Sequence, residues 1–412
     1  MNPGRIGAEM STRDPRVYVA SSVGIDYFFF LANTIRNAGF NVKELYLIPE
    51  ESYRRQARSS GLTKIWLRVK MYLLYPAYLL KEGLRCDPSS VFVVSSNTFY
   101  APYMVRALLG FRRIKVIHML YDLFPDALEI AGGLDRRSFA SRAIGMVARR
   151  NQSRCNGTAY LGHFLRTHAE GRWGHAHHSD VIDISTDLSL YEPDYPLLPD
   201  SGQLIVHYGG QLGHLHDARS IIASVQAICG SELAERVRFN FYVSGAQAEF
   251  LRESLAAYPV DIISTAPSSQ WRRDIRNFHV GLVSLSPGGA SVCLPSKTYA
   301  MMAGGMAILA IAPVWSDLGK LVDGLEAGWV INNSRHRQEP QGSDPRYLEA
   351  ILEERPTEEI VADVKQTFAD LLSEPRQLER KRLAAFNGVR KHYGIDHLSQ
   401  RWRGLIEAVQ ES

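Results

Sequence analysis

Residues 288–310, GGASVCLPSKTYAMMAGGMAILA, combine a loop of small residues, the sequence Leu-Pro-Ser-Lys, a short helical stretch, a glycine pair and an apolar strand. Pro295 fixes its own φ angle and favours the start of a helix, and the Ser296 hydroxyl is predicted to accept a hydrogen bond from a free helix N–H. The first turn of a helix carries a partial positive charge, to which Lys297 adds a full one. The pattern predicts a phosphate site at this helix start. An ordinary capped helix in an α/β domain is the alternative.

Strand-turn-helix units surround this segment and recur along the chain. In the second half, strands are predicted at 204–208, 239–243 and 280–285, with a glycine turn at 209–213 and a helix at 217–228. In the first half, strands are predicted at 17–20, 41–48, 91–94 and 114–120, with a small-residue turn at 21–24 and a helix at 27–38. Strands that alternate with helices predict parallel sheets covered on both faces.

Length and composition are those of a globular protein. The 412 residues allow two or three domains, and 45% of them are hydrophobic and 22% charged. A net charge of +4 gives no indication of nucleic-acid binding at this length. The four cysteines are far apart in sequence, which argues against a disulfide framework or structural zinc and is typical of a reducing compartment.

Membrane contact is predicted for one segment only. Residues 1–15 are polar and are expected to form a loose tail, neither signal peptide nor anchor, and no apolar run approaches the roughly 20 residues that span a bilayer. Residues 62–85 place cations among aromatic and apolar side chains, which suits a helix lying on an anionic membrane. The alternative is a helix packed on its own sheet. The cations are Lys64, Arg68, Lys70, Lys81 and Arg85, and the apolar group includes Trp66, Leu67, Leu73 and Leu74.

The segment 288–310 resembles the donor-binding signature of retaining glycosyltransferases of the GT-B fold, in the large family 4 that includes bacterial capsule, O-antigen and exopolysaccharide enzymes. The sequences Ser316-Asp317-Leu318 and Ala327-Gly328-Trp329-Val330 follow where that family has similar residues. The resemblance implies two Rossmann-like α/β domains with a cleft between them and a C-terminal helix that crosses back. We expect a tail at 1–15, an acceptor-side domain at 16–195, a nucleotide-sugar domain at 196–390 and the returning helix at 391–412.

The resemblance also implies which residues hold the donor. Lys297 and the glycine loop are expected at the diphosphate, because backbone N–H groups and cations stabilise a leaving phosphate. The loops after two further strands are expected at the base and ribose, although they are equally consistent with plain turns. The complete donor set is Gly209, Gly210, Gly213, Ser244, Gly245, Thr265, Ala266, Pro295, Ser296, Lys297 and Thr298.

On the first domain, residues 118–126 resemble the family's histidine-aspartate-leucine-x-proline passage. Asp122 matches, whereas Tyr121 stands where many members have histidine. Tyr121, Asp122 and Lys297 are therefore the catalytic candidates, and Gly24 and Asp122 the acceptor-side ones. His118 lies within the predicted strand and is interpreted as a core histidine rather than a catalytic base.

Two departures limit what the resemblance implies. The family's acidic pair falls at Val292 and Ala300, so its usual ribose and sugar-hydroxyl contacts do not transfer. The sequence has no Asp-x-Asp motif, and the patch of His175, His177 and His178 lies in a predicted loop. No metal or other cofactor is expected.

The sequence thus predicts transfer of a sugar from a UDP- or GDP-sugar to a lipid-linked or oligosaccharide acceptor, with retention, in surface polysaccharide or glycolipid assembly. We expect a cytoplasmic enzyme on the inner face of the cell membrane, held through residues 62–85, and no nucleic-acid partner. A sugar-nucleotide epimerase and a non-catalytic nucleotide-binding protein of the same fold are the alternatives.

Overall fold

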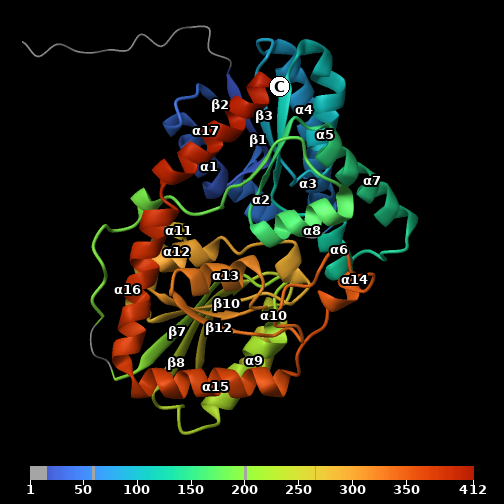
Figure 1. The fold of residues 1–412 in the computed structure, drawn as a ribbon. Coiled ribbons are helices and arrows are strands. Elements are labelled where there is room, and N and C mark those ends of the chain that lie inside the picture. Colours follow the sequence, from blue (N-terminus) through green and yellow to red (C-terminus); the bar gives the residue numbers. More distant parts are fainter. Residues whose placement is uncertain (1–15, 58–60, 199–201, 265) are drawn as a thin grey trace, which may run out of the picture.

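The computed structural model describes residues 16–57, 61–198, 202–264 and 266–412, so the tail predicted at 1–15 lies outside the described residues. Two six-stranded parallel sheets form the framework, one above the other in Figure 1. The first has the order β2-β1-β3-β4-β5-β6 and the second β12-β11-β10-β7-β8-β9. The strands are β1 Val17–Gly24, β2 Val42–Pro49, β3 Val91–Ser95, β4 Lys115–Leu120, β5 Gly157–Tyr160, β6 Ser179–Val181, β7 Leu204–Gln211, β8 Val237–Ser244, β9 Val260–Ile263, β10 Val280–Ser284, β11 Ala307–Ile311 and β12 Gly328–Ile331.

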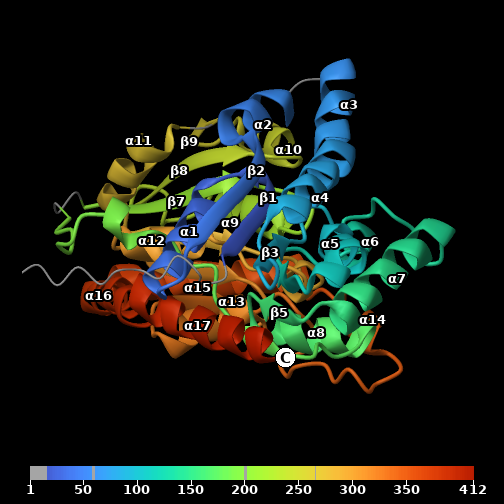
Figure 2. The same cartoon turned by 90° about the horizontal axis from the view of Figure 1, so that it is seen from above.

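Helices connect the strands and cover both faces of each sheet (Figures 1 and 2). The helices of the first domain are α1 Asp26–Asn37, α2 Glu50–Ala57, α3 Leu62–Val69, the π-helical turn η1 Lys70–Leu74, α4 Tyr75–Arg85, α5 Ala101–Leu109, α6 Asp126–Ile130, α7 Phe139–Arg154 and α8 His163–Trp173. Those of the second domain are α9 Ala218–Cys229, α10 Ala248–Leu255, α11 Ser268–Asp274, α12 Lys297–Ala303, α13 Asp317–Gly324, α14 Tyr347–Ala350, α15 Thr357–Ser373 and α16 Pro375–His392. Short 3₁₀ turns are η2 Gly110–Arg112, η3 Leu188–Leu190, η4 Ile275–Asn277 and η5 Gly289–Ser291.

Two of the predicted turns are strand in the structure. The small-residue stretch 21–24 belongs to β1, where Gly24 pairs with Pro49, and the glycine stretch continues β7 to Gln211, paired with Ser244. Small residues are typical of turns, so the sequence alone predicts a turn here. The strand continues because the neighbouring strand still provides hydrogen-bond partners for the backbone.

The returning C-terminal helix is confirmed. Helix α17, Ile395–Glu411, packs against α1 of the first domain (Figure 1). The hydroxyl of Ser399 donates to the carbonyl of Thr34 at 3.0 Å, and the amide of Asn37 donates to Asp396 at 3.0 Å. Five apolar side chains of α17, spaced so that they share one face of the helix, are buried: Leu398, Trp402, Leu405, Ile406 and Val409.

Hydrogen bonds between the two halves fix how the sheets face each other. The carboxylate of Asp317, at the start of α13, accepts from the backbone N–H groups of Phe164 (2.9 Å) and Leu165 (3.0 Å) at the start of α8. Tyr299 of α12 donates its hydroxyl hydrogen to Asp183 at 2.9 Å. A carboxylate at a helix N-terminus is favoured by the helix dipole, so α8 is capped from across the interface.

Candidate active site

The strand order of the second sheet reverses between β7 and β10, and ligands of open parallel sheets bind beyond the strand ends at such a point. Gly210 lies there with a φ of +107°, a region that favours glycine. Lys297 begins α12, and a Cβ placed on Gly210 would lie 3.5 Å from its Cδ. The fold thus brings Gly210 and Lys297 into contact.

Lys297 has the surroundings of an anion-binding lysine. Its Nζ is buried without a hydrogen-bond partner among the described residues, 3.8 Å from the ring centroid of Tyr208. Burial lowers the pKa of Lys297 to about 7, and the neighbouring Cys293 acts weakly in the opposite direction. Burial, with a smaller effect of Lys297, lowers the pKa of His216 to about 3, so that ring is neutral. A buried unpaired ammonium disfavours folding, so pairing with an anion would favour the charged form of this side chain.

The start of α12 differs from the predicted cap. Ser296 was expected to accept a helix N–H with its hydroxyl, and this is wrong: its φ of −58° and ψ of −29° are already helical, and its side chain makes no capping bond. A capping serine needs an extended backbone to direct its oxygen at the helix N–H groups. The carbonyl of Pro295 accepts from the N–H of Thr298 at 3.1 Å, and the buried Thr298 Oγ1 has no partner in the described part of the chain.

Two of the predicted phosphate glycines have packing roles. A Cβ on Gly209 would lie 2.8 Å from the Trp271 indole nitrogen, whose N–H donates to His207 Nε2 at 2.9 Å. The backbone N–H of Gly213 donates to His216 Nδ1 at 3.2 Å. Gly210 is the member of this glycine set that lies against Lys297.

The predicted base and ribose contacts lie beside this loop. The carbonyl of Ser244 accepts from the N–H of Leu212 at 2.6 Å. Gly245 has a φ of +109°, and a Cβ there would come within 2.8 Å of the Leu212 carbonyl oxygen. Thr265 lies outside the described residues, and the role of its neighbour Ala266 stays a prediction.

Tyr121 and Asp122 directly follow β4 on the first domain. Their backbone N–H groups both donate to the Ser96 Oγ, at 2.8 and 2.9 Å. Burial raises the pKa of Asp122 to about 6, and burial, followed by the charge of Asp122, raises the pKa of Tyr121. At neutral pH Asp122 is mainly ionised and Tyr121 protonated. Such a carboxylate can accept a hydrogen bond or a proton from a substrate hydroxyl.

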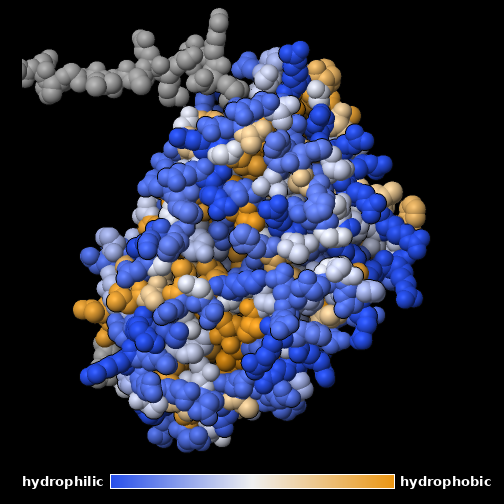
Figure 3. Space-filling view, viewed as in Figure 1, coloured by the Kyte–Doolittle hydropathy of each residue, from blue (hydrophilic) through white to orange (hydrophobic). Residues whose placement is uncertain are grey.

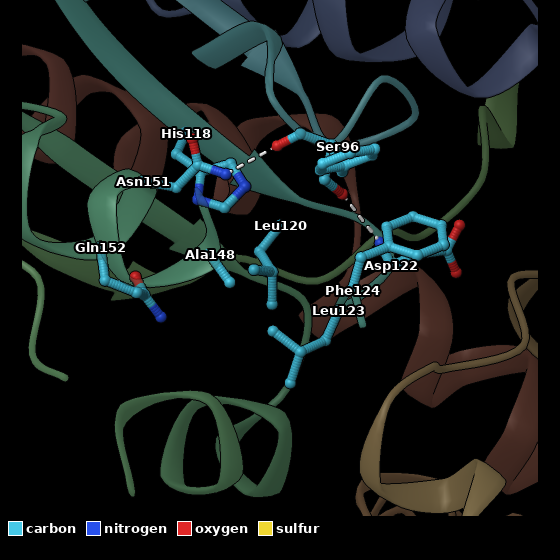
Figure 4. Close-up of a pocket in the computed structure, with 10 residues that line it drawn as sticks. Ser96, His118, Leu120, Asp122, Leu123, Phe124, Ala148, Asn151 and Gln152 are labelled. Atoms are coloured by element: carbon cyan, nitrogen blue, oxygen red, sulfur yellow. Dashed lines mark hydrogen bonds between the residues drawn. The ribbon is translucent and has the colours of Figure 1, made fainter. Parts of the chain in front are cut away.

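A small cavity of about 10 Å³, room for one water molecule, lies between β4 and α7 (Figure 4). His118 lines it and is 2% exposed; burial lowers the pKa of this imidazole to about 3. His118 is thus a core residue, as interpreted, but neither of its ring nitrogens has a hydrogen-bond partner among the described residues. Figure 4 shows the carboxyl group of Asp122 pointing away from His118, out of the cavity.

Asp122 and Lys297 approach one region from different domains. Cys293, in the loop before α12, lies within electrostatic range of both: burial chiefly raises the pKa of its thiol, Asp122 raises it further and Lys297 lowers it. Gly24 ends β1, where a Cβ would lie 3.1 Å from the ring of Tyr46, and its acceptor-side role stays a prediction.

Val292 and Ala300, which stand where the family has its acidic pair, are buried apolar residues. Val292 is fully buried and Ala300 is 6% exposed, so neither position presents a group to solvent. The side chains of the histidine patch have separate partners. His175 Nδ1 lies 3.0 Å from the carboxylate of Glu170, and His177 Nε2 lies 2.9 Å from the carbonyl oxygen of Ser153. Within the described ranges, no three His, Cys, Asp or Glu side chains are grouped as metal ligands.

No protein-family profile matches the chain. WbjE of Pseudomonas aeruginosa, a probable glycosyltransferase, is 22% identical over 304 residues, which cover 70% of this chain and 71% of that protein. The sucrose-phosphate synthase of Thermosynechococcus elongatus has a TM-score of 0.62 at 14% identity, over 96% of this chain and 100% of that one. HepE of Anabaena, solved in complex with UDP, has a TM-score of 0.62 at 10% identity, with the same coverage. The chain has the GT-B fold of these structures, as the sequence predicted.

Proposed function

We propose that this protein is a glycosyltransferase that moves a sugar from a UDP- or GDP-sugar to an acceptor hydroxyl. The observation that carries the proposal is the buried, unpaired Nζ of Lys297 beside Gly210 at the switch point of the second sheet. A nucleoside diphosphate supplies the negative charge that would pair with this ammonium. The likeness to WbjE and to the UDP complex of HepE supports the same assignment.

In the proposed reaction Lys297 stabilises the charge that develops on the diphosphate as the glycosidic bond breaks. The positive charge that a metal ion gives other transferases would then come from the protein. Asp122 would orient the acceptor hydroxyl, whose proton passes to the leaving phosphate, and the anomeric configuration would be retained. Retention and the absence of a metal requirement follow from the resemblance of residues 295–297.

A panel of UDP- and GDP-sugars tests this function. Binding of the right nucleotide should raise the melting temperature, and turnover should release the free nucleotide, also in EDTA. A product with inverted sugar stereochemistry and an intact nucleotide would indicate the epimerase. Stabilisation without any turnover, across a broad set of acceptors, would indicate the non-catalytic alternative.

A lipid-linked acceptor is proposed because α3 and η1 expose apolar side chains. Three apolar side chains there are largely exposed, Leu62 (84%), Trp66 (51%) and Leu73 (63%), whereas Leu67 packs inside. Figure 2 shows α3 extending from the edge of the molecule. Figure 3, which has the view of Figure 1, shows hydrophilic side chains over most of that face, with apolar ones near its centre and at a few places on its edge. A packed amphipathic helix would have buried these residues.

The positive charge around α3 and η1 supports an anionic bilayer as the binding partner of their exposed apolar side chains. Residues 62–154 contain 15 Lys and Arg against 6 Asp and Glu, a net +9 in a chain of net +4. No helix in the described residues is long and apolar enough to cross a membrane. Cations near an anionic surface add about 1 kcal/mol each. We therefore propose reversible attachment to the inner face of the cell membrane, with an acceptor of surface polysaccharide or glycolipid assembly.

Vesicle co-sedimentation tests the attachment. Wild-type protein should pellet with anionic but not neutral vesicles, and added salt should release it because exposed charges are screened beyond about 8–10 Å. Reversing the charges of Lys64, Arg68 and Lys70, or changing Trp66→Ser, should prevent binding. Phe250→Ser, an equally exposed aromatic change on the second domain, is the matched control and should bind normally. Wild type that stays in the supernatant with anionic vesicles at low salt would exclude the membrane and favour a soluble oligosaccharide acceptor.

A further inference from the structure

We propose that Ser96 is a positioning residue for Asp122, an inference that rests on the proposed function and adds a residue to its machinery. Ser96 follows β3, and Asp122 lies beyond the end of the neighbouring strand β4. The Oγ of Ser96 accepts hydrogen bonds from the N–H groups of Tyr121 (2.8 Å) and Asp122 (2.9 Å). One side-chain oxygen therefore holds the turn that carries both candidates, as Figure 4 shows for Asp122.

The position of Ser96 makes this oxygen hard to replace. Ser96 is 2% exposed, and the cavity of about 10 Å³ that it lines has room for one water molecule. One water at most can therefore take over from its hydroxyl oxygen. Without the oxygen, the N–H of Asp122 loses its acceptor, whereas that of Tyr121 keeps the carbonyl of Met119 at 3.1 Å. Buried N–H groups are rarely left unpaired. The turn would then rotate toward another acceptor and carry the Asp122 carboxyl with it.

Ser96 is itself fixed, because the loop 96–100 is anchored at both ends. Its own N–H donates to the carbonyl of Met119 in β4 at 3.0 Å. Side-chain hydrogen bonds hold the rest of the loop to α7 and to η1. They run from Asn151 to the carbonyl of Phe99 (2.7 Å), from Thr98 to that of Met71 (2.9 Å) and from Tyr100 to that of Tyr72.

A misplaced Asp122 should affect turnover and leave donor binding intact. Gly210 lies in β7 and Lys297 begins α12, both in the second domain, whereas the Ser96 hydroxyl is bonded to Tyr121 and Asp122 of the first domain. A displacement of about 1 Å at a reacting group can cost about 100-fold in rate. Loss of Ser96 should therefore lower kcat per folded molecule, whereas KM for the donor should change little. A partly unfolded sample also lowers apparent kcat at constant KM, so the folded fraction has to be measured by thermal unfolding.

Four variants test the proposal. Ser96→Ala should lower kcat about 10- to 100-fold, with KM and nucleotide-induced stabilisation within about twofold of wild type. Ser96→Thr keeps the oxygen and should retain most activity; Ser96→Cys fills the same space with a weak acceptor and should be intermediate. The matched control is Ser95→Ala. Ser95 is 1% exposed, and among the described residues its hydroxyl accepts only the N–H of Asn97, at 3.2 Å, so kcat should be unchanged.

A kcat of Ser96→Ala equal to that of Ser95→Ala would overturn the proposal, as would a Thr variant no better than Ala. The crystal structure of Ser96→Ala gives a second readout that needs no substrate. A displaced Asp122 carboxyl supports positioning, and an unchanged turn refutes it. If instead Asp122→Asn keeps full activity, the catalytic role of Asp122 in the proposed function fails, and the structure of Ser96→Ala still decides on positioning.

Discussion

Replacing Lys297 with methionine is expected to make the protein more stable and at the same time poorly active. The variant removes a buried ammonium without a partner among the described residues and keeps the side-chain volume. Donor binding should weaken about 10- to 100-fold, the loss of a charge-assisted contact worth about 1.5–3 kcal/mol. Calorimetry with UDP and GDP measures the binding, and thermal unfolding measures the stability. Equal binding by the folded variant would remove Lys297 from the site.

The gain in stability should depend on pH with a defined sign. The folded pKa of Lys297, about 7, lies below the ordinary 10.5, so the unfolded chain binds more protons between these values. Wild-type stability therefore rises with pH across this window, and the advantage of Lys297→Met is largest below pH 7. Lys320→Met is the matched control, because Lys320 is half exposed and paired with Glu339; it should change neither quantity.

Changing Asp122 to asparagine is expected to lower kcat about 100-fold or more and to alter the pH profile. In wild type, kcat/KM should rise as Asp122 ionises near pH 6 and fall as free Lys297 loses its proton near pH 7. Asp122→Asn should lose the acid limb. In kcat the basic limb should move to higher pH, because a bound diphosphate favours the charged lysine. A variant with an unchanged acid limb would show that another group titrates there.

The stability of Asp122→Asn against unfolding distinguishes a catalytic effect from a general loss of folding. Burial raises the folded pKa of Asp122 to about 6 from 3.8, so the folded chain binds more protons in that window and stability falls as pH rises through it. Asp122→Asn should therefore be more stable than wild type above pH 6. Asp183→Asn is a matched control: burial chiefly raises the pKa of Asp183 to about 6, and its hydrogen bond to Tyr299 survives in asparagine. It should share the stability gain and keep the acid limb.

The sequence predicted the alternation of strands and helices because apolar runs of strand length and capping glycines are local signals. Apart from the Ser296 cap, its errors lie where small residues continue a strand, as in β1 and β7, since only the neighbouring strand shows that the pairing continues. The exposure of Trp66 and Leu73 was left open, because an amphipathic pattern is the same whether its apolar face meets the protein or a membrane.

Residues 288–310 by themselves determined that a lysine stands at the start of a short helix that leads into an apolar strand, and the resemblance pointed to the donor site. The tertiary structure alone decided that Gly210 rather than Gly213 adjoins Lys297: a Cβ on Gly210 would lie 3.5 Å from the Lys297 Cδ, whereas Gly213 faces His216. It also added Ser96, which no motif marks. Ser96 can bond to the Asp122 turn because it follows β3, the neighbour of β4 in the sheet. The order of the strands is a property of the folded sheet, so local sequence does not show this contact. Local sequence fixes which groups are available, and the order of the strands fixes which of them meet.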